Sequence, residues 1–93
     1  MKYTVHYSKR FEKALHKVRQ LPAFKAEKLK EAITLLSLGQ KMPLHYKDHS
    51  LHGDMRSFRE CHLAPNILLI YEIDEGILTL TLVNIGSHSR LFK

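Results

Sequence analysis

Two stretches in the first half of the chain carry apolar residues at helical spacing, and each stretch has only one apolar face. The first follows Ser8, a residue type that often caps a helix. The second is expected over about residues 23–38, because Leu21-Pro22 interrupts the first helix and Gly39 can end the second. One-sided helices must bury their apolar faces against each other or against a sheet, so the rest of the chain has to supply that partner.

Strand-like segments supply it. Residues 2–7 alternate between apolar and polar positions and are expected to form a first strand. Three further strands are predicted over residues 55–63, 66–73 and 77–85, and the middle one is apolar on both faces, as a central strand should be. The last strand alternates, with one side made of Leu78, Leu80 and Leu82.

The order of these elements is β-α-α-β-β-β, with turns expected at residues 64–66 and 74–76. It predicts an α+β fold in which the N-terminal strand and a helical hairpin pack on a small, mostly antiparallel sheet. Ninety-three residues are expected to form a single domain, residues 1–93. Residues 40–53 lack any periodicity and are predicted to be a loop, and long loops in compact domains are often functional.

Composition excludes several classes of protein. The chain is 44% hydrophobic and 26% charged, which is ordinary for a soluble globular protein. Its longest apolar run, residues 67–71, is too short to cross a bilayer, and no apolar stretch follows Lys2 as it would in a secretory signal. A single cysteine, Cys61, excludes an internal disulfide and a thiolate zinc site. We therefore expect a cytoplasmic protein with no membrane partner.

Positive charge is concentrated in the first half of the chain. Residues 1–47 contain eleven Lys/Arg and three Asp/Glu, a net charge of +8, whereas residues 48–93 contain four and six, a net charge of −2. A basic surface on a small domain favours a polyanionic partner such as RNA, or an acidic protein. Solvated helix faces that keep the protein soluble would give the same charge, so both interpretations stay open at this point.

Histidines and other chemically useful residues collect at the ends of the predicted strands. His62 ends one strand, His88 follows the last strand, and His49 lies in the loop. Within the strand at residues 55–63, Glu60 and His62 share one face, and a face carrying both is not expected to be all core. If the helices cover the opposite face, a half-polar surface is left open for a ligand.

These residue types suit the cleavage of RNA without a metal. A base must take the proton from a 2′-hydroxyl, cations must stabilise the charge on the phosphate, and an acid must protonate the departing 5′-oxygen. Histidine can serve as acid or base, and arginine or lysine can bind the phosphate. Taken singly, each histidine is also explained as a structural residue, Arg59 and Arg90 as surface cations paired with carboxylates, and Phe92 as packing for the tail.

A metal site is the alternative explanation for part of the histidine set. His45, His49 and His52 have the spacing of a three-histidine face on a helix. Pro43 and Gly53 bracket them, and no apolar residues support a helix there. We therefore expect no metal and no cofactor.

Three blocks of sequence carry a resemblance to a known family. Residues 46–53 read YKDHSLHG, residues 58–66 read FRECHLAPN and residues 86–92 read GSHSRLF. They closely resemble the signature of YafQ-like toxins in the RelE/ParE superfamily, which reads approximately YKDHxLxG, then [YF]R[DE]xHxxPD, then GxHxxLF. The blocks occur in the same order and spacing, and the strand–helix–helix start also matches, so the resemblance covers the whole chain.

The resemblance implies a RelE-like fold and the toxin half of a bacterial toxin–antitoxin pair. Such toxins enter the ribosomal decoding site and cut messenger RNA there without a metal. A cognate antitoxin protein holds them inactive in a hetero-oligomer. The expected partners are therefore this antitoxin, the ribosome with its RNA, and mRNA.

Site residues follow from the same resemblance. His49, His62 and His88 match the catalytic histidines, with His88 as the general acid, and Phe92 matches the aromatic residue near the RNA. The family usually has an Asp after the proline, and this Asp is a candidate general base. This chain has Asn66 there, which cannot accept a proton at neutral pH. The base is then expected to be His62 or His49, and Asn66 is expected only to orient the substrate.

The expected substrate-binding set is larger. An arginine that the family often has before GxH is missing here, where residues 83–85 read VNI. Phosphate binding is then expected from Lys47, Arg59 or Arg90, and Glu60 is included in the substrate-binding set.

Three other functions remain open from the sequence. A ParE-like toxin of the same fold poisons DNA gyrase by binding and needs no catalytic histidines. A degenerate member, suggested by Asn66, would bind RNA or an antitoxin without cutting. Metal-dependent hydrolysis would be lost in a chelator.

Overall fold

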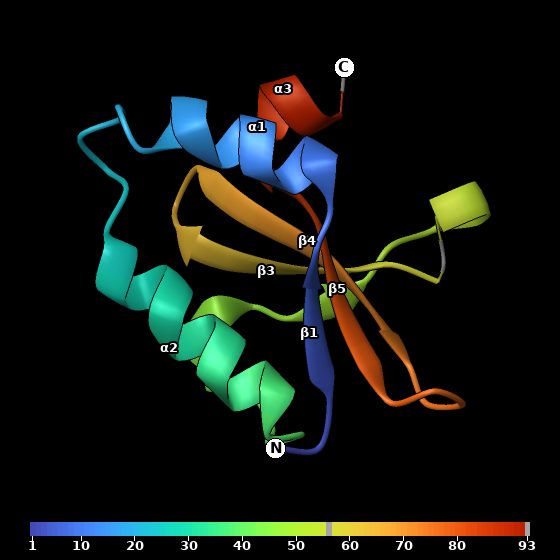
Figure 1. Cartoon of the computed structure of the whole chain (residues 1–93). Coiled ribbons are helices and arrows are strands. Elements are labelled where there is room, and N and C mark those ends of the chain that lie inside the picture. The colour runs from blue at the N-terminus through green and yellow to red at the C-terminus, as the bar shows by residue number, and fades with distance from the viewer. Residues whose placement is uncertain (56, 93) are drawn as a thin grey trace.

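The computed structural model describes residues 1–55 and 57–92 and has a five-stranded sheet with helices packed against it (Figure 1). In chain order its elements are β1 (Thr4–Tyr7), α1 (Lys9–Val18), α2 (Ala26–Ser37), the 3-10 turn η1 (Leu44–Tyr46), β2 (His49–Ser50), the 3-10 turn η2 (Gly53–Met55), β3 (Arg59–Ala64), β4 (Ile67–Asp74), β5 (Thr79–Gly86) and α3 (His88–Leu91).

The strands lie in the order β1-β5-β4-β3-β2. β1 is parallel to β5, and every other neighbouring pair is antiparallel. The sheet therefore confirms the prediction of an α+β fold with a small, mostly antiparallel sheet. The first strand, β1, therefore lies at one edge of the sheet beside the last strand, β5, although the two are far apart in the sequence (Figure 1).

Both N-terminal helices bury the faces that their sequence predicted. Ser8 caps α1, with its Oγ accepting a hydrogen bond from the Phe11 backbone N–H at 3.0 Å. Phe11 and Val18 of α1 are buried, and this helix packs on β5. α2 buries Leu29, Ala32 and Leu36 and reaches β3. Within the residues described, no helix is long and apolar enough to cross a membrane.

β4 forms the centre of the core. Its residues 67–71 are all buried, which explains why this segment is apolar on both faces. Leu80, Leu82 and Ile85 from β5 and Cys61 from β3 complete the same core, each with at most 1% of its surface exposed. The sheet thus holds β3 and its polar neighbours in a fixed position.

The start of β3 differs from the prediction. A strand was expected from residue 55, but β3 begins at Arg59 because Gly53–Met55 form the turn η2. Gly53 has a φ of +66°, a left-handed conformation that favours glycine and turns the chain before it extends. Residue 56 of the predicted strand lies outside the described residues.

Two short elements were missed because they are too short to show a periodicity. The predicted loop over residues 40–53 contains β2, which has two residues and pairs with Arg59 and Glu60 through its backbone. The predicted C-terminal tail contains α3, a single helical turn that Ser87 caps through a hydrogen bond from the Arg90 N–H. α2 begins at Ala26, later than predicted, since residues 21–24 form a turn.

Leu78 was predicted to share one face of the last strand with Leu80 and Leu82, and this prediction was wrong. Leu80 and Leu82 are fully buried, whereas Leu78 lies before the start of β5 and is 46% exposed. Its φ of +53° belongs to the turn between β4 and β5. The turn therefore overrides the alternation of the sequence at this position.

The buried core gives a first prediction. Leu69→Ala removes a fully buried side chain from β4 and should lower the free energy of unfolding by about 2–5 kcal/mol. Leu44→Ala is the matched control, because Leu44 is 89% exposed, and it should change stability by less than about 0.5 kcal/mol. Urea denaturation of the two variants measures both values, and equal losses would contradict the placement of the core.

Two buried acidic groups give a second prediction. Burial raises the pKa of the Cys61 thiol from its ordinary value of 9.0 to about 12, and the charges of Asp48 and Glu60 act in the same direction. Burial is also the largest reason that the pKa of the Tyr71 hydroxyl is raised, followed by its hydrogen bond to Asp48. At alkaline pH the unfolded chain therefore loses protons that the folded chain keeps.

Below about pH 8 both groups keep their protons in the folded and the unfolded chain, so they should add no pH dependence to the free energy of unfolding. It should fall as the pH rises past about 9 and more steeply past about 10, by up to about 1.4 kcal/mol per pH unit for each group. Urea denaturation between pH 7 and pH 11 measures this slope. Cys61→Ala should reduce the slope between pH 9 and pH 10, and an unchanged slope would show that the thiol does not contribute.

Candidate active site

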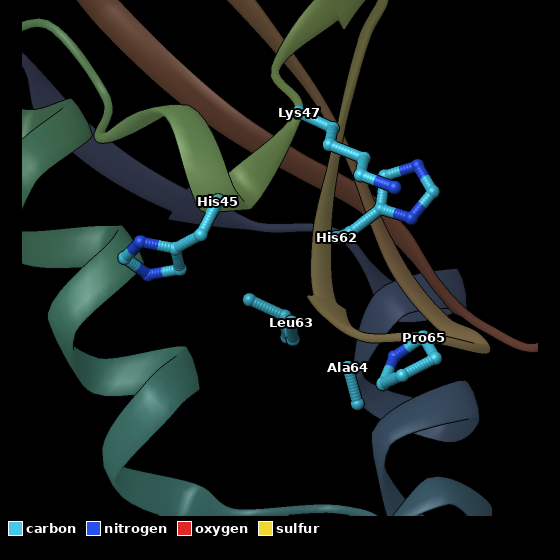
Figure 2. Close-up of a pocket in the computed structure, with 6 residues that line it drawn as sticks. All are labelled: His45, Lys47, His62, Leu63, Ala64 and Pro65. Carbon is cyan, nitrogen blue, oxygen red and sulfur yellow. The ribbon is translucent and has the colours of Figure 1, made fainter.

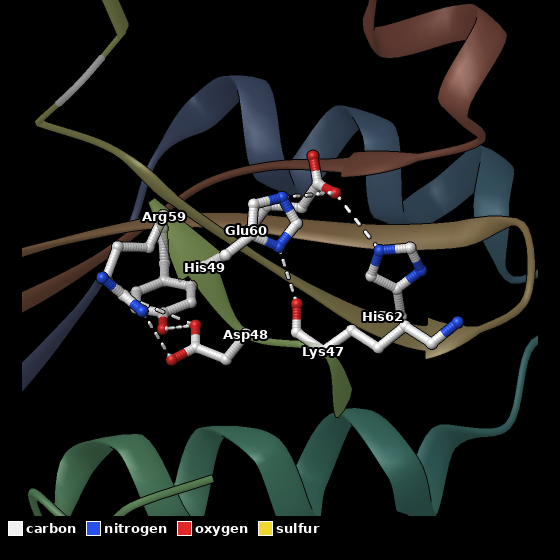
Figure 3. A network of polar contacts seen from close by, with 7 residues as sticks. Lys47, Asp48, His49, Arg59, Glu60 and His62 are labelled. Carbon is white, nitrogen blue, oxygen red and sulfur yellow. Dashed lines mark hydrogen bonds and ion pairs between the residues drawn. The ribbon is translucent and has the colours of Figure 1, made fainter. Parts of the chain in front are cut away.

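The carboxylate of Glu60 lies between two of the predicted catalytic histidines (Figure 3). β2 and β3 pair with His49 directly opposite Glu60, and His62 follows two residues later on the same face of β3. Glu60 Oε1 is 3.5 Å from His49 Nε2 and 3.3 Å from His62 Nε2. Only 5% of Glu60 is exposed, and the two histidines are the polar side chains in contact with its carboxylate among the described residues.

The two histidines differ in the ring nitrogens that they have available. The Nδ1–H of His49 donates to the Lys47 carbonyl oxygen at 2.7 Å, so both ring nitrogens of His49 have a partner. Lys47 adopts a left-handed conformation with a φ of 50°, which turns this carbonyl toward the ring. His62 uses only Nε2 among the contacts of the described residues. When Nε2–H points to Glu60, Nδ1 of His62 carries the lone pair.

A second carboxylate fixes the segment that carries His49. The buried Tyr71 hydroxyl donates to Asp48 Oδ1, and Arg59 Nη2 donates to Asp48 Oδ2 at 3.0 Å (Figure 3). The hydrogen bond to Asp48 is the largest reason that the pKa of Arg59 is raised. Arg59 was predicted either to bind substrate or to be a surface cation paired with a carboxylate. In the structure its charge is paired with Asp48.

His88 is held at the first turn of α3. Its backbone N–H donates to the side-chain oxygen Oδ1 of Asn66 at 3.2 Å. The His88 and Phe92 rings lie with their centroids 5.1 Å apart. Asn66 therefore positions the residue predicted to be the general acid, through its main chain.

The predicted catalytic histidines surround two cavities. One, of about 320 Å³, is lined by His49, Glu60, His88 and Phe92, together with Leu51 and His52. The other, of about 360 Å³, is lined by His45, Lys47, His62, Leu63, Ala64 and Pro65 (Figure 2). The structure thus brings all three histidines to one region, where Glu60 lines the first cavity and contacts His62 of the second. Arg90 lies elsewhere, in a third cavity that it shares with Lys17 and Asn66.

The three-histidine helical face that would have favoured a metal site does not form. His45 lies in η1, His49 in β2 and His52 in the segment before η2. Each belongs to a different local structure, so their spacing of four and three residues has no helical meaning here. This agrees with the prediction that no α-helix forms between Pro43 and Gly53.

Sequence reasoning missed the support that Tyr71 and His45 give to the site. Tyr71 read as one more apolar residue of a central strand, and nothing in its pattern indicated that its hydroxyl reaches Asp48. His45 had been considered only as a metal ligand, although it lines the cavity beside His62. The adjacent sequence Lys47-Asp48-His49 was the available signal, since all three residues contribute to the site.

Comparisons with known proteins agree with this arrangement. The model of the family described as "Bacterial toxin of type II toxin-antitoxin system, YafQ" matches residues 3–93. A relative from Escherichia coli K12, named mRNA interferase toxin YafQ, is 32% identical over 94 residues, which cover 99% of this chain and 94% of the relative.

Solved structures extend the likeness to three dimensions. A metal-bound toxin from Helicobacter pylori is 41% identical and superposes with a TM-score of 0.88, over 97% of this chain and 99% of that chain. The E. coli DinJ–YafQ toxin–antitoxin complex contains a chain that is 31% identical, with a TM-score of 0.84 and complete coverage of both chains. The RelE-like fold expected from the sequence is therefore confirmed, and this chain belongs to the YafQ family of bacterial toxins of type II toxin–antitoxin systems.

Proposed function

We propose that this chain is an endoribonuclease that cleaves mRNA on the ribosome in the cytoplasm and that a cognate antitoxin holds it inactive. The observation that carries the proposal is the Glu60 carboxylate between His49 and His62, beside a cavity that also contains His88 and Phe92. The set contains histidines that can serve as acid and base, because His88 lines this cavity and His62, which contacts Glu60, lines the second one. The names of the E. coli relatives support the same activity.

In the proposed reaction His62 is the base. Its Nε2 lies 3.3 Å from Glu60 Oε1, and in the tautomer with the proton on Nε2 the Nδ1 lone pair takes the proton from the 2′-hydroxyl of RNA. The 2′-oxygen then attacks the phosphorus, and the bond from phosphorus to the 5′-oxygen breaks. His88 gives its proton to that departing oxygen, and the products are a 2′,3′-cyclic phosphate and a free 5′-hydroxyl.

His49 has a different task from His62, because both its ring nitrogens are engaged. Its ring lies over the buried Glu60 carboxylate and lines the cavity that contains His88. It is therefore suited to hold Glu60 and to face the phosphate, and poorly suited to accept a proton. Glu60 is only 5% exposed but lines the cavity that contains His88, and in the proposed reaction it orients the two histidines.

A metal-dependent reaction has less support from these residues. The solved H. pylori neighbour is a metal-bound toxin. In the described part of this chain, no group of three or more His, Cys, Asp or Glu side chains is arranged to hold a metal ion. Since the residues do not fit such a site, the proposed reaction contains no step through a metal.

An acidic antitoxin segment is the partner that the basic first half of the chain favours. The solved E. coli complex pairs YafQ with DinJ, which supports a hetero-oligomer of this chain with its own antitoxin. The exposed cations of α1, among them Lys9, Arg10, Lys13 and Lys17, are available to ribosomal RNA or to such an antitoxin. Affinity for the ribosome should then fall steeply with salt, because phosphate contacts release counterions.

His88→Ala tests the reaction. It should abolish cleavage and toxicity while the fold and the binding of the antitoxin remain, because His88 is exposed and supplies only the acid. His16→Ala is the matched control, since His16 is an exposed histidine on α1. Primer extension on mRNA from a coupled translation reaction measures the cuts.

The expected result is discrete cuts at ribosome-positioned codons with wild type and His16→Ala, none with His88→Ala, and no change when EDTA is added after translation. A His88→Ala protein that stays fully toxic would exclude the reaction. Growth arrest with intact mRNA and an induced DNA-damage response would favour a gyrase poison. Binding of RNA or antitoxin without cuts would indicate a degenerate member.

Asn66 gives a separate prediction. Its Oδ1 accepts the His88 N–H, and a carboxylate oxygen would accept the same bond at the start of a helix, so Asn66→Asp should fold normally. If His62 is the base, Asn66→Asp should change the rate of cleavage by less than about tenfold, whereas Asn66→Ala should slow it by loosening His88. Single-turnover cleavage measures both. A rate hundreds of times higher in Asn66→Asp would mean that the chain is an attenuated enzyme.

A further inference from the structure

The cavity beside His62 has no role in the reaction proposed above apart from its contact with that histidine. Its volume is about 360 Å³, and its lining combines an apolar floor of Leu63, Ala64 and Pro65 with the basic side chains of Lys47 and His45. Pockets that bind small ligands are of this size and combine an apolar floor with a few polar groups. Figure 2 shows that these residues come from two segments, the η1 region and the end of β3.

The cavity exists because β2 is so short. β2 pairs with β3 only at Arg59 and Glu60, so the remainder of that edge of β3, residues 61–64, is not covered by β2. The chain before β2 folds as η1 instead and places Lys47 alongside His62 (Figure 3). A cavity with a cation beside it can offer a charge to a phosphate.

We propose that this cavity binds the nucleoside on the 5′ side of the bond that is cut, the one whose 2′-hydroxyl attacks. The inference rests on the proposed function and gives the RNA a direction. His88, which protonates the leaving 5′-oxygen, lies with Phe92 in the other cavity, so the 3′ nucleoside belongs there. His62, which takes the 2′-proton, lines this cavity, so the nucleoside that carries the 2′-hydroxyl must be beside it.

Charge supports RNA as the occupant. Lys47 is exposed, and among the described residues no carboxylate lies within ion-pair distance of its amino group. Arg59, by contrast, has its charge paired with Asp48, and Arg90 lines a different cavity. Of the three cations that the sequence offered for phosphate binding, Lys47 is therefore the one placed next to the base His62. Its amino group binds a phosphate oxygen of the substrate, and the apolar floor contacts the nucleobase.

Two kinds of variant test the subsite by cleavage. Ala64→Leu narrows the cavity and His45→Ala widens it, so both should change the preference for the base immediately 5′ of the cut by tenfold or more without changing the preference on the 3′ side. Leu44→Ala is the control, because Leu44 belongs to the same turn η1 and does not line the cavity. Sequencing of the cut ends from an mRNA pool of mixed codons measures both preferences.

The charge has its own pair of variants. Lys47→Gln keeps a polar side chain, one atom shorter, and removes its charge, and it should lower kcat/KM about tenfold or more because an ionic hydrogen bond to phosphate is lost. Lys25→Gln removes an exposed lysine outside this cavity and should have little effect. Equal effects of the two substitutions would mean that Lys47 acts only through the overall charge and would overturn its place in the subsite.

A binding experiment separates failure of the subsite from failure of the proposed enzyme. A 2′-O-methyl RNA trinucleotide cannot be cut, since it lacks the nucleophile, and it needs no ribosome. Titrated into the folded chain, it should shift the NMR amide signals of Lys47 and Ala64 in wild type and Leu44→Ala, and much less in Ala64→Leu.

Shifts at Lys47 and Ala64 would support the subsite even if wild type fails to cut mRNA, in which case only the proposed reaction would fall. Shifts confined to the cavity of Lys17 and Arg90, or none at millimolar trinucleotide, would overturn the subsite. An unaltered 5′ base preference in both Ala64→Leu and His45→Ala would overturn it as well, while leaving the enzyme intact.

Discussion

A carboxylate that is almost fully buried needs hydrogen-bond donors, and the site is organised around that requirement at Glu60. Burial of an unpartnered charge costs free energy, and the side chains of His49 and His62, at 3.5 and 3.3 Å from the carboxylate, offset part of that cost. The same contacts hold the Nε2 atom of each ring near Glu60, and His62 Nδ1 has no hydrogen-bond partner among the described residues. One set of contacts therefore partners the buried carboxylate and positions the proposed base.

Asp48, which directly precedes β2, is a second partly buried carboxylate with hydrogen-bond partners, and it connects the site to the core. Its carboxylate accepts hydrogen bonds from Tyr71, which is buried in the central strand, and from Arg59 at the start of β3. The backbone of residues 47–49 is thereby fixed to β3 and β4, although β2 has only two residues. This anchoring explains how a short and mostly exposed segment can keep His49 opposite Glu60 and Lys47 beside His62.

Much of the fold could be predicted from local patterns. The apolar faces of α1 and α2, the Ser8 cap and the doubly apolar strand β4 follow from periodicity and from the physical preferences of single residues. The prediction failed at Leu78, where a turn with positive φ interrupts the alternation, and at β2, which is too short to show one. The resemblance to YafQ-like toxins predicted the three histidines as a set, but it left open which was the base and which cation served the phosphate.

The sequence by itself determined the order of the elements, the family and the residue types that the site contains, because periodicity, turns and motifs are properties of neighbours along the chain. Tertiary structure alone decided which of these residues meet. Glu60 lies opposite His49 because β2 pairs with β3 in one register, and Arg59 forms an ion pair at 3.0 Å with Asp48, which is eleven residues away in sequence. Such contacts depend on how the strands pack, and that packing is set by the whole core at once.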